Sequence, residues 1–371
     1  MAKAVIIDDE APILELMSKF CRSLGHEISG CQTGAAGIAA LREIRPDFVI
    51  VDLLIGDVNG LDVIRLCRTE LPTAAVIMVT AHGSVETAVE AMRLGVRNFV
   101  QKPWDNAQLV TILRTEVDAG RVRRQQAAVE RRELDEARRI QRKLLPSTMP
   151  ALEGWEVSVS WQPAAGVGGD CFDAIPFGPA RLGLSIADVV GKGIPAALLM
   201  ANLQAAVRAF ATNTTEPAEL CQQVNRILCG HIAEGRFISF FYCIVDHDES
   251  TLTFANAGHY PPILIRADGT IERLDTGGAV LGVFPERGYE QGQVSLRGGD
   301  RIILYTDGIT DVCNAADEEF GEARLVDLAV ANRGCSAPAL QARLANAVDA
   351  FSDGRFQDDA TLIVLAAEQS V

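Results

Sequence analysis

Four short acidic motifs follow one another in the C-terminal part of the chain. They read GGDCFD, IADVVGKG, LYTDGITD and QDDATLIVL, and their carboxylates belong to Asp170, Asp173, Asp188, Asp307, Asp311, Asp358 and Asp359. Apolar β-type runs lead into or out of three motifs, so strand ends at one sheet edge would gather these side chains. Several carboxylates at close range raise one another's pKa unless a cation lies among them. Oxygen ligands without His or Cys favour magnesium or manganese, and a pair of such ions typically serves phosphate-ester hydrolysis.

A second group of polar residues stands at the ends of apolar runs in the first 120 residues. The runs AVIID, FVIVD, AVIMVT and NFVQ alternate with amphipathic helical patterns. This alternation predicts a parallel sheet covered by helices on both faces. Functional residues of such sheets gather beyond the carboxyl ends of the strands, and those ends carry Asp8, Asp9, Asp52, Thr80 and Lys102.

These strand-end residues have the chemistry of an acyl-phosphate site. Asp8 and Asp9 can hold one divalent cation together with Asp52. The cation would neutralise the Asp52 carboxylate, which could then attack a phosphoryl donor, and Thr80 and Lys102 would contact the transferred phosphate. A cis bond between Lys102 and Pro103 would aim the lysine inward, although most such bonds are trans.

Residues 3 to 118 resemble the receiver domain of two-component response regulators. The resemblance implies a doubly wound α/β domain with a five-stranded parallel sheet. It also implies phosphorylation of Asp52, one Mg²⁺ bound by the acids Asp8, Asp9 and Asp52, and the switch residues Thr80, Phe99 and Lys102. Gly60 stands where the family has glycine, but Gly56 replaces a proline that many receivers carry, which leaves the rigidity of this loop in question.

Residues 138 to 367 resemble the bacterial branch of the metal-dependent protein phosphatases of the 2C type. Besides the acidic motifs, the stretches ARRIQRKLLP, FISFFYCIVD, ANAGHYPP and GGAVLGVF carry the resemblance. Members of this branch regulate stress responses and sporulation by removing phosphate from serine or threonine of small antagonists of anti-sigma factors. The resemblance implies an α+β domain of two packed sheets flanked by helices.

The resemblance also assigns roles to single residues of this domain. Two Mg²⁺ or Mn²⁺ ions would be bound by Asp170, Asp188, the backbone carbonyl of Val189, Asp307 and one of the pair Asp358 and Asp359, with Asp358 preferred. Lys192 would either meet the substrate phosphate or be a surface lysine. Asp173 and Asp311 would either support the metal ligands or serve as cap and turn residues.

The stretch between the two resemblances lacks proline from residue 107 to residue 145 and is expected to be helical. Gly120 is expected to cap or bend the helix. We therefore expect a receiver domain over 1–120, a helical linker over 121–150 and a phosphatase domain over 151–371. Val122 and Val129 stand seven residues apart, but the apolar pattern is too patchy for a regular coiled coil. The linker would pack on the domains or on its copy in a homodimer, or else be a solvated helix.

Composition limits the remaining classes of function. The N-terminus MAKAVIIDDE has acids where a signal peptide has its apolar region, and the nine cysteines form no CxxC pair. Both features favour a reducing cytoplasm over a disulfide or zinc framework. The apolar stretch IPAALLMANLQAAV is interrupted by polar residues and is expected to be too short to span a bilayer. The net charge of −15 argues against nucleic-acid binding.

The sequence thus predicts a response regulator with an enzymatic output. A histidine kinase or phosphotransfer protein would phosphorylate Asp52, and this would control dephosphorylation of an anti-sigma factor antagonist. The alternative is a pseudophosphatase adaptor that binds a sigma factor or its regulator without catalysis, but every expected metal acid is present. A DNA-binding regulator is a third class, and no stretch is left unassigned that reads as a helix-turn-helix.

Overall fold

The computed structural model describes residues 2–81, 85–94, 96, 98–164, 166–212, 214, 216–232 and 235–368. These residues form two units, Met1–Arg132 and Glu133–Val371. The stretch expected as a linker, residues 121–150, is divided between the two units.

The N-terminal unit is built on a parallel sheet with the strand order β2-β1-β3-β6-β7. Its elements are β1 (Lys3–Ile7), α1 (Ala11–Ser23), β2 (Glu27–Cys31), α2 (Gly34–Ile44), β3 (Phe48–Asp52), β4 (Leu54–Ile55), β5 (Val58–Asn59), α3 (Gly60–Glu70), β6 (Ala75–Thr80), α4 (Val85–Arg93), β7 (Asn98–Gln101) and the first part of α5 (Asn106–Leu144). The predicted doubly wound five-stranded receiver fold is confirmed.

Two apolar cores explain why the three central strands, β1, β3 and β6, are almost entirely apolar. On one face of the sheet, Leu14, Met17 and Cys21 of α1 meet Leu109 and Leu113 of α5. On the other face, side chains of α2, α3 and α4 form a second core. Because both faces are buried, β3 and β6 have no exposed residue, and polar side chains remain only at the strand ends.

The loop after β3 is held in place by an aspartate that caps a neighbouring helix. The Asp57 carboxylate accepts the backbone N–H groups of Gly34, at 2.7 Å, and Ala35, at 3.0 Å, at the start of α2. These hydrogen bonds lower the pKa of Asp57 and complement the positive end of the helix dipole. These hydrogen bonds and the β4–β5 hairpin restrain the loop. They supply restraint that Gly56, unlike a proline, does not supply.

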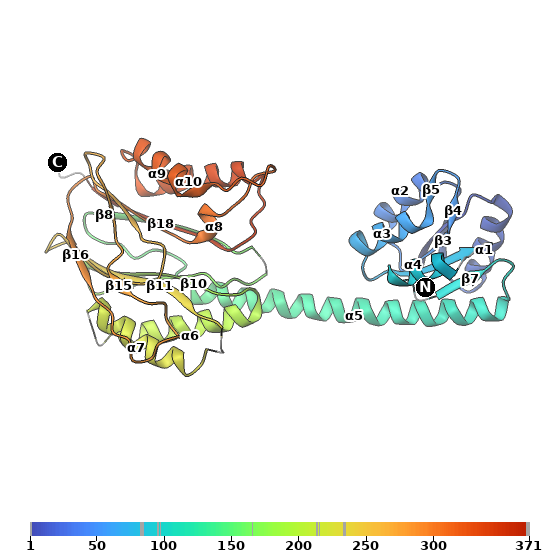
Figure 1. The fold of residues 1–371 in the computed structure, drawn as a ribbon, viewed down its shortest axis with the longest axis horizontal. Coiled ribbons are helices and arrows are strands. Elements are labelled where there is room, and N and C mark those ends of the chain that lie inside the picture. Colours follow the sequence, from blue (N-terminus) through green and yellow to red (C-terminus); the bar gives the residue numbers. More distant parts are fainter. Residues whose placement is uncertain are drawn as a thin grey trace. The chain divides into compact units, whose positions relative to one another are not determined.

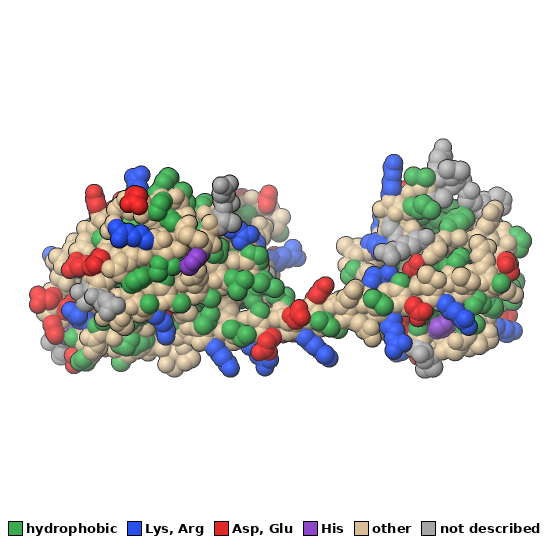
Figure 2. Space-filling model, turned by 90° about the horizontal axis from the view of Figure 1, so that it is seen from below, with side chains coloured by type: hydrophobic (Ala, Val, Ile, Leu, Met, Phe, Trp, Pro, Cys, Tyr) green, Lys and Arg blue, Asp and Glu red, His purple; other side chains and the backbone are tan. Residues whose placement is uncertain are grey.

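Helix α5 runs without interruption from Asn106 to Leu144, over 39 residues. Of the two roles considered for Gly120, the capping role was wrong, because this glycine lies inside the helix, where it is buried. None of the residues 121–140 is buried, and Figure 2 shows acidic and basic side chains spread along this stretch. Burial returns in the last turn, at Gln141.

The C-terminal unit contains two sheets, with the strand orders β15-β12-β11-β10-β9, to which β16 adds on β12, and β14-β13-β17-β18-β8. Its strands are β8 (Trp155–Gln162), β9 (Cys171–Pro176), β10 (Arg181–Val189), β11 (Ile238–Asp246), β12 (Thr251–Ala257), β13 (Ile263–Ile265), β14 (Ile271–Arg273), β15 (Gly277–Gly278), β16 (Gly292–Ser295), β17 (Arg301–Tyr305) and β18 (Ala360–Ala367). Its helices are α6 (Ile194–Ala211), α7 (Pro217–Cys229), α8 (Asp307–Thr310), α9 (Gly321–Ala331) and α10 (Ala337–Phe351).

These elements form four layers. Helices α6 and α7 cover one sheet, α9 and α10 cover the other, and the two sheets face each other in between (Figure 1). One core joins both sheets to α6 and α7, and a second lies under α9 and α10. The predicted α+β domain of two packed sheets flanked by helices is confirmed.

Helix α6 extends beyond the apolar stretch IPAALLMANLQAAV that was considered as a membrane span. With 18 residues and a mean hydropathy of 1.4, it is long and apolar enough to cross a membrane by length and composition. The expectation that this stretch is too short was therefore wrong. In the structure Met200, Leu203 and Val207 are buried in the core between α6 and the sheet, and the interrupting Gln204 donates a hydrogen bond to the carbonyl of Leu144.

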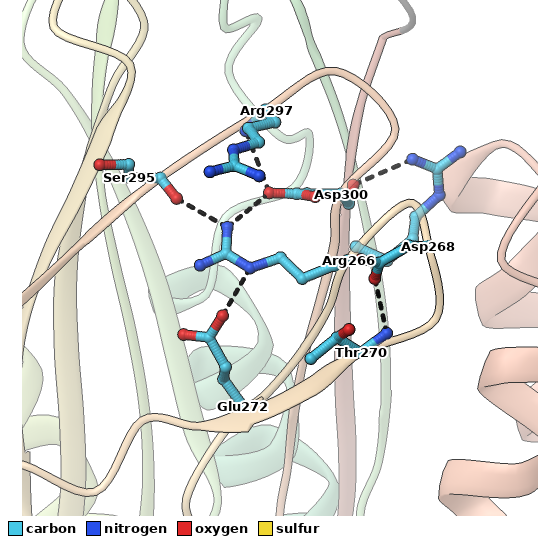
Figure 3. A network of polar contacts seen from close by, with 8 residues as sticks. Arg266, Asp268, Thr270, Glu272, Ser295, Arg297 and Asp300 are labelled. Atoms are coloured by element: carbon cyan, nitrogen blue, oxygen red, sulfur yellow. Dashed lines mark hydrogen bonds and ion pairs between the residues drawn. The ribbon is translucent and has the colours of Figure 1, made fainter.

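A polar network joins the turn before β17 to the neighbouring hairpin (Figure 3). The guanidinium of Arg266 lies 2.8 Å from the carboxylate of Asp300 and 2.6 Å from that of Glu272. It also donates to the carbonyl of Ser295, at 2.7 Å. Asp300 is only 1% exposed, so its charge depends on Arg266 and on the backbone N–H of Arg297.

Candidate active site

The four acidic motifs meet where the two sheets of the C-terminal unit come together. Asp170 directly precedes β9 and Asp188 is the penultimate residue of β10, and these strands are neighbours in the first sheet. Asp307 follows β17 after one residue, and Asp359 directly precedes β18, its neighbour in the second sheet. Hydroxyl groups from the second sheet reach Asp170 in the first, so the two pairs of strand ends share one site.

Asp170 is the most enclosed acid of this site, with no exposed surface. Its Oδ2 accepts hydrogen bonds from the hydroxyl groups of Thr306, at 2.7 Å, and Thr361, at 2.6 Å. Its Oδ1 is buried without a hydrogen-bond partner among the described residues. Burial, and then the charge of Asp188, raise the pKa of Asp170 well above its usual range. A buried oxygen of this kind calls for a partner that protein atoms do not supply.

Mutual repulsion also marks the other acids of the site. Burial, and then the charges of Asp307, Asp358 and Asp359, raise the pKa of Asp188 to about 7. Burial and the charge of Asp358 likewise raise the pKa of Asp307. Neighbouring carboxylates with raised pKa values are typical of a site for divalent cations in the absence of the ions, because bound cations would stabilise the ionised form.

The adjacent acids Asp358 and Asp359 have different surroundings. Asp359 is buried and uses both carboxylate oxygens to accept backbone N–H groups, from Ala164 at 2.8 Å and from Gly169 at 2.5 Å. Asp358 is half-exposed and lies 3.0 Å from the ammonium group of Lys192. These contacts support Asp358 as the candidate ligand, because Asp359 is already occupied in holding the glycine-rich loop.

Three glycines are required where the loops of the site touch each other. A Cβ atom on Gly168 would lie 2.5 Å from the carboxylate of Asp359, and one on Gly308 would lie 2.0 Å from its backbone carbonyl. A Cβ atom on the neighbouring Gly169 would meet the carbonyl of Val189 at 2.8 Å. Only glycine allows this close approach, which brings the Val189 carbonyl to the acids.

The remaining residues named from the sequence lie in different surroundings. Asp173 is buried and forms two hydrogen bonds with Arg208 of α6, at 2.6 and 2.8 Å, so it fixes α6 to β9. Asp311 is exposed and caps the C-terminal end of α8, where it accepts the hydroxyl of Thr310. Burial lowers the pKa of His259 to about 4, which fits a neutral structural hydrogen bonder.

Sequence reasoning missed three residues that contact the site. Thr306 and Thr361 stand inside the motifs LYTDGITD and QDDATLIVL, directly before and two residues after acids, but they read as ordinary strand residues. Gln141 belongs to ARRIQRKLLP, where it reads as one polar residue of a charged helix. The sequence did offer one signal for all three, because each is a polar residue inside a stretch that carries the family resemblance.

The predicted phosphoacceptor site lies at the carboxyl edge of the receiver sheet. The ammonium group of Lys102 lies 2.5 Å from Asp52 and 2.7 Å from Asp8, and the Lys102–Pro103 bond is cis, as the sequence analysis had considered. Burial opposes the lysine charge, but hydrogen bonds to Asp52, Asp8 and Glu10 raise the pKa of Lys102 overall. The lysine offsets one of the negative charges of this pocket, and the acids still have the spacing to hold a divalent cation.

The acids of this pocket differ in one respect from the expected set. Ligand oxygens of Asp8, Glu10 and Asp52 lie within 4.8 Å of one another, whereas Asp9 is exposed beside the β4–β5 hairpin. Glu10 was not named from the sequence. A Cβ atom on Gly60 would lie 2.1 Å from the carbonyl of Asp52, which explains the glycine at that position.

The switch residues take positions around the same strand ends. Thr80 ends β6 and is buried, and its carbonyl accepts the backbone N–H of Lys102 at 2.8 Å. Phe99 is half-buried in β7 and packs against the core under α2 to α4. Both residues are therefore joined to the part of the sheet that carries the lysine.

Fold and site together define a class. A receiver sheet with an acid–lysine pocket, followed by a four-layer sandwich with an acidic cluster between its sheets, is a response regulator joined to an output domain with the fold of 2C-type protein phosphatases.

Comparison with known sequences gives the family. The profile described as Stage II sporulation protein E matches residues 178–368, and that of the response regulator receiver domain matches residues 4–114. Phosphoserine phosphatase RsbU from Bacillus subtilis is 30% identical over 234 residues, which cover 63% of this chain and 69% of RsbU. The chain belongs to the Stage II sporulation protein E family.

Another curated relative and two solved structures are similar to parts of the chain. Protein IcfG from Synechocystis sp. is 28% identical over 287 residues, covering 70% of this chain but only 44% of IcfG. The chain therefore spans less than half the length of that relative. The crystal structure of the RsbU and RsbW domains of Rv1364c from Mycobacterium tuberculosis matches with a TM-score of 0.53 and 26% identity, covering 62% of this chain and 64% of that one. The SiaA-PP2C domain of Pseudomonas aeruginosa shares the fold, with a TM-score of 0.56, 22% identity and coverage of 65% and 99%.

Proposed function

We propose that phosphoryl transfer to Asp52 controls a metal-dependent phosphatase in this protein, and that the phosphatase hydrolyses phosphoserine or phosphothreonine on another protein. The observation that carries the proposal is the fully buried Oδ1 of Asp170, which has no hydrogen-bond partner in the described part of the chain and lies amid acids whose pKa values are raised. This donor set fits hard divalent cations. Two Mg²⁺ or Mn²⁺ ions, when bound, would supply an acidified water as the nucleophile toward phosphorus.

The chain's own residues divide the work of this site. Asp170, Asp188, Asp307 and Asp358 would hold the ions through their carboxylates, joined by the backbone carbonyl of Val189. The hydroxyl groups of the two buried threonines orient the first of these carboxylates, as partners of metal ligands commonly do. Asp359 holds the glycine-rich loop in place rather than an ion.

Lys192 is the candidate for contact with the substrate. Its ammonium group pairs with Asp358 and donates to the carbonyl of Gln357, at 2.6 Å, yet its side chain is 58% exposed. Cations bound at Asp358 would compete with this pair and release the lysine toward an incoming phosphate. Asp173 and Asp311 support the site from outside, through α6 and α8.

The receiver would supply the control. A histidine kinase or phosphotransfer protein would donate the phosphoryl group, with one Mg²⁺ bound at Asp52 and Asp8 and with either Asp9 or Glu10 as the third acid. Lys102 already lies within hydrogen-bond distance of Asp52. Phosphorylation would then shift Thr80 and Phe99 between two arrangements, in the manner of a population shift.

The likeness to the family supports a proposal for the substrate and the setting. We propose a phosphorylated antagonist of an anti-sigma factor as the substrate, supported by the likeness to RsbU, whose name describes a phosphoserine phosphatase. We place the protein in the cytoplasm, where its nine free cysteines would stay reduced. We also propose that two chains pair through α5, and that the protein binds neither nucleic acids nor membranes.

Turnover of p-nitrophenyl phosphate with Mn²⁺, with and without beryllofluoride as a mimic of phosphorylated Asp52, tests both halves. We expect metal-dependent turnover that changes with beryllofluoride in the wild type, no turnover in Asp188→Asn, and no beryllofluoride response in Asp52→Asn. Turnover that ignores beryllofluoride would remove the control. Metal binding without turnover on this substrate or on a phosphoprotein would instead favour the alternative of an adaptor that binds a sigma factor or its regulator.

A further inference from the structure

We propose that Gln141, in the last turn of α5, is a positioning residue that holds the loop 166–170 in the shape required for metal binding. The inference rests on the proposed function and deepens it, because it names the contact through which α5 acts on the phosphatase site. Gln141 lies outside the metal-binding motifs and was not among the residues expected to act.

The contact is a pair of hydrogen bonds between one side chain and one backbone residue. The Gln141 amide donates to the carbonyl of Gly168, at 2.6 Å, and accepts the N–H of Gly168, at 3.0 Å. Gln141 is 3% exposed, whereas none of the residues 121–140 of the same helix is buried. A buried amide is tolerated only when its polar groups are satisfied, and here one glycine satisfies both ends.

The residue that Gln141 binds lies two positions before Asp170. On the other side of the same loop, Asp359 accepts the N–H groups of Gly169, at 2.5 Å, and Asp170, at 3.5 Å. Glycines 168 and 169 have no side chains of their own to fix their backbone. The direction in which Asp170 presents its free oxygen therefore depends on these two anchors, Gln141 and Asp359.

The last turn of α5 also contacts the second segment that carries a metal acid. Gln204 of α6, itself buried, donates to the carbonyl of Leu144. Helix α6 begins five residues after Val189, so it follows directly on the Asp188 strand. The last turn of α5 thus forms hydrogen bonds both with the loop that carries Asp170 and with α6, the helix that follows the Asp188 strand.

The other end of the same helix belongs to the receiver. Leu109 and Leu113 of α5 are fully buried in the receiver core, and the helix continues unbroken to Leu144. A rotation or shift of α5 would therefore act on the phosphatase loop through Gln141. This gives the proposed control a specific contact, which a movement of α5 would break.

Two substitutions separate the contributions of this side chain. Gln141→Leu keeps the volume and removes both hydrogen bonds. Gln141→Glu keeps the acceptor for the Gly168 N–H but places a carboxylate against the Gly168 carbonyl and adds charge near the acids. The matched control is Gln125→Leu, at an exposed position of the same helix.

The test uses the full-length protein and two readouts that do not depend on turnover. Calorimetric titration measures Mn²⁺ affinity, and amide hydrogen exchange measures protection of peptides covering 164–172. We expect Gln141→Leu to weaken Mn²⁺ binding by about 10- to 100-fold, as loss of a residue that orients a metal ligand does. We also expect faster exchange in 164–172 and unchanged exchange in α9 and α10, with Gln125→Leu equal to the wild type.

Each outcome decides a different question. Wild-type affinity and wild-type loop exchange in Gln141→Leu would overturn the inference. If that variant does not fold, Gln141→Glu takes its place, and wild-type affinity in it would overturn the inference as well. A wild type that neither binds Mn²⁺ nor turns over substrate would instead refute the proposed function, while the exchange data would still report whether Gln141 holds the loop.

Discussion

Thr361 gives the sharpest test of how the acidic cluster is organised. Its hydroxyl donates to Asp170 Oδ2 at 2.6 Å, and the side chain is fully buried. Valine has nearly the same shape, so Thr361→Val removes the hydrogen bond with little change in packing. Thr306 is a less suitable target, because its hydroxyl also accepts the backbone N–H of Thr361.

The size of the effect follows from the charge of the acceptor. A hydrogen bond to a charged group contributes about 1.5–3 kcal/mol, which corresponds to roughly a 10- to 150-fold change in an equilibrium constant. Without this donor, the buried Asp170 carboxylate is less well oriented and less readily ionised. We therefore expect Thr361→Val to weaken Mn²⁺ binding by about 10- to 100-fold and to leave turnover at saturating Mn²⁺ within a few-fold of the wild type.

Calorimetry with Mn²⁺ gives the affinity, and p-nitrophenyl phosphate turnover across a Mn²⁺ series gives the saturating rate. The control is Thr251→Val, at a half-buried strand position in β12. An affinity within two-fold of the wild type in Thr361→Val would refute the reasoning, provided that Asp170→Asn abolishes binding. In that case Asp170 would bind metal without help from its hydroxyl partners.

Three further predictions concern charge. Arg266→Ala should destabilise the C-terminal unit by about 3 kcal/mol, since it leaves a buried carboxylate without its partner; a urea midpoint equal to that of Arg297→Ala would contradict this. The folded, metal-free protein keeps a proton on Asp188 up to its pKa of about 7, whereas the unfolded chain loses it near pH 4. Stability should therefore fall as pH rises between these values, and thermal melts of Asp188→Asn should show a shallower decline; equal slopes would count against the raised pKa. Lys102→Ala should lower the melting temperature of the receiver without Mg²⁺, because Asp52 and its neighbours lose their counter-ion. Excess Mg²⁺ should restore the melting temperature by binding to the same acids. An unchanged melting temperature without Mg²⁺ would show that the lysine does not offset the charge of these acids.

The strands that sequence reasoning found are the continuous apolar ones. The receiver strand Phe48–Asp52 and the phosphatase strand Arg301–Tyr305 are buried along their whole length, so their aliphatic runs identified them. The strands Glu27–Cys31 and Cys171–Pro176 were not identified. Both lie at a sheet edge and mix polar with apolar residues, so their pairing depends on neighbours far away in the chain.

The same limit applies to the site. Aspartates at strand ends were visible because the chemistry of acids is specific, and the family resemblance named most of them. The threonines that donate to Asp170, and Gln141 that binds Gly168, were not named. Each of these residues acts through a hydrogen bond to a segment that is distant in the sequence. The partners are 136 and 191 positions apart for the threonines and 27 positions apart for the glutamine.

The neighbouring residues Asp358 and Asp359 have different roles in our proposal, one in metal binding and the other in holding a loop. Asp359 accepts the backbone N–H groups of Ala164 and Gly169, while Asp358 lies beside Lys192. A substitution at Asp358 would remove a proposed metal ligand and keep these backbone hydrogen bonds, whereas a substitution at Asp359 would break them and disturb the loop. One substitution at Asp358 is therefore expected to leave a folded domain without turnover, which is the starting point for evolution into a non-catalytic binding protein.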